Sequence, residues 1–363
     1  MKNFSSWAII VSLVLVSSSR AWAGDEIIVK TDAARRFAVL PDGVRFPEGI
    51  TANPNTEAIY VGTFDFGPNS NKLLRFNKKG QLVAQRDFDV TPLLGLQFNP
   101  WDKKIYIANV GALVGKASKI QRIAADFTDN TPVEDVALIP GVGPPPKRVV
   151  DNPDGSQDTI FFGNNAPAPN GLTLDYHGNL YVSDSFQGAV FRIDHAHECD
   201  ASCSVTTVKH DGLLTTAGFP PFGGNGLALN RNGTKLFIAN SGDDRILQLD
   251  LKTGELNIWA ESLNGPDGIA FYSGRLVVVE NQSDVVSILN DKGGVVAKLG
   301  AFLGIRDDGS PRGLLFPASL VIVDDKIFVT NLALPLTMTQ GDEPEEDVTK
   351  YTISEIEIPK HSR

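Results

Sequence analysis

The sequence predicts an all-β protein, a six-bladed β-propeller with four antiparallel strands per blade and a ring closed by an N-terminal strand. Three observations lead to this fold class. Aromatic and β-branched segments are punctuated by 34 Gly and 22 Pro among 363 residues, as expected for many short strands. One short sequence phrase recurs six times along the chain. Further strand-like segments follow each copy, so that a unit has room for four strands.

The composition excludes several other classes of protein. Hydrophobic residues make up 42% of the chain, too many for a disordered protein, and 2 Cys are too few for a fold held together by disulfides. The net charge of −10 and the pI near 5.0 argue against binding to nucleic acid, which requires a basic surface. We therefore expect a small-molecule partner, and a monomer.

The N-terminus, residues 1–23, has the pattern of a secretory signal peptide. Lys2 precedes an apolar run from Trp7 to Val16, and Ala21-Trp22-Ala23 has the small-residue pattern of a cleavage site. The run is about half the ~20 residues that a bilayer-spanning helix needs, which argues against an uncleaved membrane anchor. We expect residues 24–363 to form one exported domain, periplasmic or secreted, without a membrane span.

The six copies of the repeated phrase share an apolar strand that opens on a residue followed by glycine (serine in the last copy). We call the residue before this glycine or serine the anchor. The second strand of each unit follows its anchor after 10 to 12 residues, whereas successive anchors are 42 to 76 residues apart. Constant spacing within units and variable spacing between them is typical of propeller blades. The anchors are Glu48, Leu94, Asn170, Asn225, Asp267 and Ala318.

The last unit lacks a clear fourth strand after its third, residues 351–358. A strand near 27–30 or 36–40 is expected to supply it and close the ring. Three insertions should reach the face on which the anchors lie. We expect residues 141–169 to form a lid, 212–224 a pocket wall and 332–349 a loop whose acidic part is solvated.

Four of the six anchors carry oxygen donors, namely Glu48, Asn170, Asn225 and Asp267. The symmetry of a propeller would bring them together around its axis. Two carboxylates and two amide oxygens suit a hard divalent cation, most naturally Ca²⁺. Without a cation, two close carboxylates would raise each other's pKa values. The alternative is that Asn-Gly and Asp-Gly mark hairpin turns, but here these dipeptides precede the first strand of each unit.

A second set of polar residues is found where the second strand of each unit ends. We predict that these residues contact the substrate or support the metal ligands, although polar residues at loop starts need no function. The set consists of Thr63, Asn109, Asp184, Asn240, Asn281 and Asn331.

The two cysteines, Cys199 and Cys203, are only four residues apart. In an exported protein this spacing favours a small disulfide across a surface loop. The alternative is a metal site that also uses His195 and His197, but the spacing matches no standard zinc motif.

At its anchors the sequence resembles the senescence marker protein/gluconolactonase (regucalcin) family of six-bladed β-propellers. The resemblance is carried by P-E-G at Glu48, P-N-G at Asn170, G-N-G-L at Asn225 and G-P-D-G-I at Asp267. It implies one divalent metal bound by Glu48, Asn225 and Asp267. It further implies that Asn170 is a ligand or orients the substrate and that Asp267 transfers protons. Leu94 and Ala318 are apolar and cannot contribute ligands.

These observations together predict an exported, calcium-dependent hydrolase of lactones or related esters. The cation would polarise the carbonyl, and Asp267 would activate water with the help of Asn170. The absence of a G-x-S-x-G motif argues against a serine esterase. Aromatic and proline residues at 219–222 hint at an apolar portion of the substrate. A non-catalytic ligand-binding propeller and a metal-independent strictosidine synthase-like enzyme are the alternatives.

Overall fold

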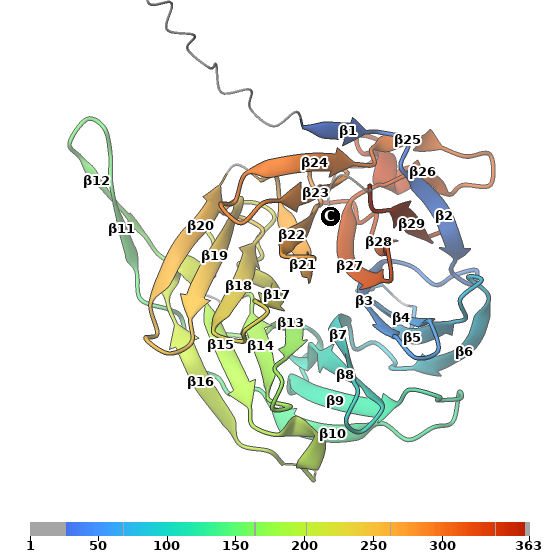
Figure 1. Ribbon diagram of the computed structural model, residues 1–363, viewed down its shortest axis with the longest axis horizontal. Helices are drawn as coiled ribbons and strands as arrows, with labels where there is room; N and C mark the ends of the chain where they lie inside the picture. The colour runs from blue at the N-terminus through green and yellow to red at the C-terminus, as the bar shows by residue number, and fades with distance from the viewer. Residues whose placement is uncertain are drawn as a thin grey trace, which may run out of the picture.

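The computed structural model describes residues 27–359, except residues 68, 163, 164, 201, 262 and 338. The predicted signal peptide lies outside the described residues. The described residues form six sheets of four or five strands, arranged as blades around a central axis (Figure 1). The predicted six-bladed propeller is confirmed. None of the helices in this part of the chain has the length and apolar character needed to cross a bilayer.

Each blade runs outward from the axis, and its neighbouring strands are antiparallel, apart from one added strand described below. The innermost strands are β3 (Pro47–Asn53), β7 (Leu93–Asn99), β13 (Pro169–Leu174), β17 (Gly224–Leu229), β21 (Pro266–Tyr272) and β27 (Pro317–Val323). The second strands are β4 (Ala58–Thr63), β8 (Lys104–Asn109), β14 (Leu180–Asp184), β18 (Lys235–Asn240), β22 (Arg275–Glu280) and β28 (Lys326–Asn331).

The outer half of each blade is built in the same order. The third strands are β5 (Lys72–Phe76), β9 (Lys119–Ala124), β15 (Ala189–Ile193), β19 (Arg245–Asp250), β23 (Val285–Leu289) and β29 (Thr352–Glu357). The outermost strands are β6 (Leu82–Asp87), β10 (Glu134–Leu138), β16 (Val205–His210), β20 (Leu256–Glu261), β24 (Val295–Leu299) and β2 (Ala34–Val39). Second strands are buried over nearly their whole length, because adjacent blades cover both of their faces.

The N-terminal segment closes the ring with two strands rather than one. Strand β2 pairs antiparallel with β29 and supplies the fourth strand of the sixth blade. Strand β1 (Ile28–Lys30) pairs in parallel with β24 and adds a fifth strand to the fifth blade. The predicted closure is thus confirmed, and the first segment reinforces the neighbouring blade.

All six innermost strands share one irregularity next to their anchors. Pairing with the second strand shifts between the first and fourth residues, which skips the anchor and the residue after it. At this point neighbouring innermost strands touch through their backbones. A Cβ atom on Gly171 would lie 2.3 Å from the Asn225 carbonyl oxygen, and one on Gly49 would lie 2.0 Å from that of Leu94. The glycine of the repeated phrase is therefore required by contact between blades.

In the sixth blade Ser319 takes the place of this glycine, and a side chain makes the contact with the next blade. The Thr330 hydroxyl donates a hydrogen bond of 2.7 Å to the carbonyl oxygen of Glu48, the anchor of the first blade. The ring is therefore closed at its centre as well as at its rim.

The three insertions differ in position. Residues 141–169 include the hairpin of β11 (Arg148–Asp151) and β12 (Gln157–Ile160), which projects from the ring in Figure 1. At the base of this hairpin, Arg148 donates two hydrogen bonds of 3.0 Å to Asp243. The expectation of a lid is wrong for this insertion, because its described residues do not line the cavity around Glu48, Asn170, Asn225 and Asp267. Residues of the other two insertions do line that cavity.

Shorter elements complete the ring. The hairpin of β25 (Phe302–Ile305) and β26 (Pro311–Gly313) precedes the last blade. Four short 3₁₀ helices lie in the described loops, namely η1 (Gly111–Val114), η2 (Ala196–Glu198), η3 (Gly212–Leu214) and η4 (Pro344–Asp347). The last of these contains much of the predicted acidic loop.

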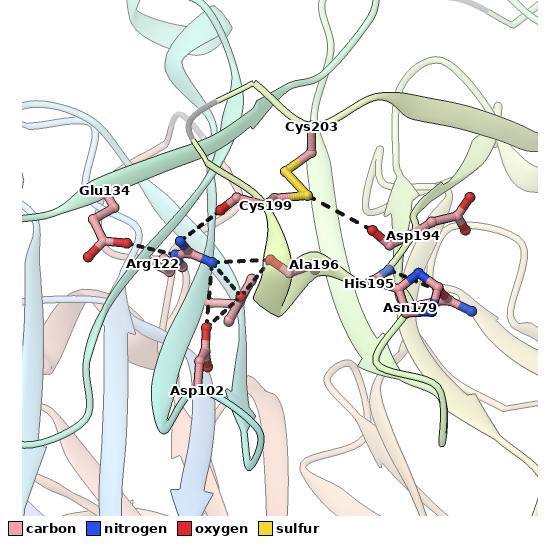
Figure 2. Close-up of a disulfide and its surroundings, with 10 residues drawn as sticks. Asp102, Arg122, Glu134, Asn179, Asp194, His195, Ala196, Cys199 and Cys203 are labelled. Carbon is pink, nitrogen blue, oxygen red and sulfur yellow. Dashed lines mark hydrogen bonds and ion pairs between the residues drawn. A yellow bond between two sulfur atoms is a disulfide. The ribbon is translucent and has the colours of Figure 1, made fainter.

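The predicted disulfide between Cys199 and Cys203 is confirmed and excludes both thiols from a metal site (Figure 2). The loop that it closes leaves the third blade and packs on the second. The buried Arg122 of β9 donates hydrogen bonds to the carbonyl oxygens of Ala196 (3.1 Å) and Cys199 (2.9 Å). The Cys203 amide donates to the Val136 carbonyl oxygen of β10.

We predict that Gly226→Ala destabilises the protein by about 1–3 kcal/mol, a typical cost of overpacking. A Cβ atom at Gly226 would lie 2.3 Å from the Asp267 carbonyl oxygen and push two blades apart. Gly141→Ala is the control, because a Cβ atom there meets no atom within 4 Å. Urea denaturation measures both effects, and equal stability of the two variants would contradict the proposed contact.

Candidate metal centre

The four oxygen-bearing anchors lie together at the face of the ring where the blade-connecting loops meet. Glu48, Asn170, Asn225 and Asp267 are each the second residue of an innermost strand, and all four are buried. They line one cavity of about 30 Å³, which we call the anchor cavity. Of the two apolar anchors, Leu94 also lines it. The structure therefore brings the predicted ligand residues to one site.

Two serines fix the orientation of the two asparagine amides. Asn170 Nδ2 donates to Ser185 Oγ (3.0 Å), and that hydroxyl donates to the Gly224 carbonyl oxygen (2.8 Å). Asn225 and Ser241 repeat the arrangement at 3.1 Å, with the Ser241 hydroxyl donating to the next blade. Because a hydroxyl has a single proton, each serine can only accept from the amide. The NH₂ group is thus held at the serine, and Oδ1 remains for a ligand.

Asp267 is oriented by an amide instead of a hydroxyl. Asn281 Nδ2 donates to Asp267 Oδ2 at 3.3 Å. Asn281, Ser185 and Ser241 each lie one residue beyond the second strand of their blade. The two serines were not among the residues predicted from the sequence. The recurring polar residue directly after the second strand, as in Asp184-Ser185 and Asn240-Ser241, was the signal that could have identified them.

Glu48 has no such support. The residue one position beyond the second strand of its blade is Phe64, and Glu48 Oε2 is buried without a hydrogen-bond partner in the described structure. Burial and the nearby charge of Asp267 raise the pKa of Glu48 well above its ordinary value. Burial also raises the pKa of Asp267 to about 8, although hydrogen bonds from Asn281 and Asn225 oppose this shift. Two ionised carboxylates in this cavity therefore require a positive charge.

The residues present fit a divalent cation with oxygen ligands. They supply one carboxylate oxygen without a partner, a second carboxylate, and two amide oxygens turned away from their serines. No nitrogen or sulfur ligand lies among them, which favours Ca²⁺ over zinc or copper. Among the described residues no group of three or more His, Cys, Asp or Glu is placed to hold a metal. A cation here would therefore depend on the asparagine oxygens.

Five of the six polar residues that we expected to contact the substrate or support the metal ligands do not line the anchor cavity. Each of the five pairs with the first residue of the innermost strand of its blade. In the fifth blade the residue that makes this pair is Glu280. Three of them bind the blade-connecting loops: Asp184 accepts from the Ala168 amide, Asn240 donates to the Thr215 carbonyl oxygen, and Asn331 accepts from the Leu315 amide. The five are Thr63, Asn109, Asp184, Asn240 and Asn331; the sixth, Asn281, does line the cavity.

The remaining wall of the anchor cavity is apolar. The expected wall at residues 219–222 is confirmed for Pro220 and Phe222, whereas Phe219 is exposed. The Phe222 ring lies 5.5 Å from that of Phe186 and 6.2 Å from that of Phe64, measured between centroids. The apolar lining consists of Phe64, Leu94, Pro220, Phe222, Phe316, Leu332, Leu334 and Leu336.

A second, larger cavity of about 1130 Å³ extends along the axis on the opposite side of the anchors. Its walls are the innermost strands and the turns that follow them. Glu48, Asn170 and Asn225 line both cavities. These three anchors therefore separate the axial channel from the face where the loops meet.

We predict that the stability of the metal-free protein falls as the pH rises from about 4 towards 8. The raised pKa values of Glu48 and Asp267 mean that the folded state binds more protons than the unfolded state in this range, so that raising the pH favours unfolding. Each pKa unit corresponds to about 1.4 kcal/mol. Denaturation in EDTA across this range measures the slope.

Asp267→Asn should flatten this pH dependence, because the variant removes one of the two neighbouring carboxylates of raised pKa. Asp32→Asn is the matched control, since Asp32 is an exposed carboxylate outside the anchor cavity. An unchanged slope in Asp267→Asn would show that the anchor carboxylates do not cause the pH dependence.

No family model matches the chain, and no curated protein is similar to it in sequence. Solved structures nevertheless share its fold. A luciferin-regenerating enzyme superposes with a TM-score of 0.61 at 12% identity, over 89% of this chain and 94% of the other. Regucalcin from Agrobacterium tumefaciens, a calcium-binding protein, superposes with a TM-score of 0.59 at 13% identity, over 92% and 97% of the two chains.

A protein classed as a gluconolactonase gives a TM-score of 0.54 at 16% identity, over 92% of this chain and 94% of the other. At such identities the similarity is one of fold. The structural neighbours include regucalcin and gluconolactonase-type propellers, in agreement with the resemblance of the anchor motifs.

Proposed function

We propose that this protein hydrolyses lactones or related esters with the help of one divalent cation, most naturally Ca²⁺. The observation that carries the proposal is the anchor cavity. It combines two buried carboxylates of raised pKa with two amide oxygens held in a fixed orientation. The resemblance to regucalcin and gluconolactonase propellers supports the same choice of substrate class.

Glu48, Asn170, Asn225 and Asp267 would hold the cation. When bound, a divalent cation supplies Lewis-acid polarisation of an ester carbonyl and stabilises negative charge on its oxygen. The two asparagines serve as neutral ligands that their serines prevent from turning. Glu48 brings a negative charge that no protein donor neutralises, and its buried Oε2 atom is free to face the ligand.

Asp267 is the residue that we assign to proton transfer. Its carboxylate lines the anchor cavity beside the other three proposed ligands, where the carbonyl of a bound ester would lie. The Asn281 amide fixes the position of Oδ2. In the proposed reaction Asp267 takes a proton from water as the water oxygen bonds to the carbonyl carbon. The proton then passes to the departing alkoxide oxygen as the ester C–O bond breaks, which yields a hydroxy acid from a lactone.

We also propose that the protein is exported, with cleavage after Ala23. The sequence pattern of residues 1–23 supports this, and so does the disulfide between Cys199 and Cys203, because disulfides persist in oxidising compartments. Mass spectrometry of the protein from its native host should find Gly24 at the N-terminus and no free thiol. A retained leader would contradict cleavage.

We predict that the native protein binds about one Ca²⁺ per chain and that Glu48→Gln weakens binding at least tenfold, because the variant loses a charged ligand. Isothermal titration calorimetry on protein stripped with EDTA measures both affinities. The exposed Asp32→Asn serves as control and should bind like the native protein. Failure of the native protein to bind any divalent cation would contradict the proposed site.

Asp267→Asn should lower kcat on a simple γ-lactone by roughly 10²–10⁴-fold, the usual contribution of an acid–base group. Unchanged circular dichroism would show that the fold persists. Full turnover in this variant would refute the assigned role of Asp267. Cation binding by a native protein that hydrolyses no lactone or ester would refute the hydrolase and indicate a non-catalytic propeller.

A further inference from the structure

We propose that the anchor cavity selects lactones or esters whose non-reacting part is apolar, an alkyl or aryl group, and discriminates against polyhydroxylated sugar lactones. This inference rests on the proposed function and names the substrate class of the same site. It follows from the wall that faces the four anchors.

The polar groups around the cavity have few hydrogen bonds left to offer a sugar. Besides the four proposed ligands, Ser241 and Asn281 are the polar lining residues in the described structure. Ser241 accepts from Asn225 and donates to the Pro266 carbonyl oxygen. Asn281 donates to Asp267 and accepts from Gln282 Nε2 at 3.3 Å. Sugar hydroxyls entering this cavity would exchange bonds with water for contacts with carbon, which is unfavourable.

The apolar wall comes from several parts of the ring. Phe64 follows β4 of the first blade, Phe222 belongs to the segment before β17, and Phe316 directly precedes β27. The fourth part is residues 332–336, which we call the leucine segment because Leu332, Leu334 and Leu336 line the cavity. An apolar group bound between these side chains and the anchors would be removed from water.

The present volume of about 30 Å³ accommodates about one water molecule, so a substrate must displace part of the wall. Phe222 is held to the ring by two backbone hydrogen bonds. Its carbonyl oxygen accepts from the Gly242 amide, and the amide of the following residue, Gly223, donates to the Ser185 carbonyl oxygen. The outer leucine segment is held less firmly. Leu334 and Leu336 are partly exposed, and the Leu336 amide donates to Glu343 of the same loop. We therefore assign substrate entry to displacement of Leu334 and Leu336.

The test uses a series of γ-lactones that carry n-alkyl tails of one to seven carbons, with glucono-δ-lactone as the polar comparison. In the native calcium-loaded protein, kcat/KM should rise about three- to fourfold for each methylene until the wall is filled. Glucono-δ-lactone should be hydrolysed at least 100-fold less efficiently than the best alkyl lactone. A flat series, or preference for glucono-δ-lactone, would overturn the inference while leaving the hydrolase intact.

Leu334→Ala and Leu336→Ala connect this preference to the leucine segment. Both residues are partly exposed, so the variants should fold, and each should reduce the gain per methylene to about twofold. Leu138→Ala, a leucine that is 64% exposed on β10, is the matched control and should keep the native gradient. If both leucine-segment variants keep the native gain in kcat/KM per methylene, Leu334 and Leu336 do not form the apolar wall that contacts the alkyl tail.

If the native protein hydrolyses none of these compounds, a binding experiment tests whether the cavity prefers apolar ligands, independently of the proposed hydrolysis. Non-hydrolysable γ-lactams with the same tails then replace the lactones, and the melting temperature is measured at saturating ligand. A shift that grows with tail length would support an apolar ligand site in a protein that is no hydrolase. The absence of such a trend would overturn the inference as well.

Discussion

The whole ring depends on direct backbone contact between neighbouring innermost strands. The carbonyl oxygen of one anchor lies where a Cβ atom on the glycine of the preceding blade would be, as for Gly171 against Asn225 and Gly226 against Asp267. This contact sets the distance between blades and hence the width of the axis. It also fixes the point from which each anchor side chain starts. The packing that builds the fold is therefore also what gathers the two carboxylates and two amides.

On this nearly symmetric backbone, chemistry arises from side chains that break the symmetry. Serine or asparagine one residue past the second strand orients three anchors, whereas Phe64 leaves Glu48 unsupported. Leu94 and Ala318 contribute no oxygen donors. The polar anchors are thereby set against an apolar wall. The anchor cavity therefore combines four oxygen-bearing side chains with an apolar lining.

The blades and the meeting of the anchors were predictable because each depends on short, repeated spacing within a hairpin. The orienting serines were not predicted. The sequence places Asn281 in one set with Asp184 and Asn240, but Pro266 pairs with Glu280, so that Asn281 holds the position of Ser185 and Ser241. The position of residues 141–169 could not be predicted from the sequence either. Their course depends on Arg148 meeting Asp243, a contact between residues 95 positions apart. Contacts at such separations leave no periodic signal in the sequence.

The double closure by β1 and β2 has a consequence for how the chain assembles. The two carboxylates belong to the fifth and first blades, and the sixth blade, which carries Ala318, lies between them. During synthesis the N-terminal strands emerge first, yet their partners β24 and β29 come almost last. Closure of the ring places Glu48 and Asp267 in the same cavity, where burial and their proximity disfavour two negative charges. A cation that binds the finished ring would draw this last step to completion, coupling maturation of the protein to the ionic composition of its compartment.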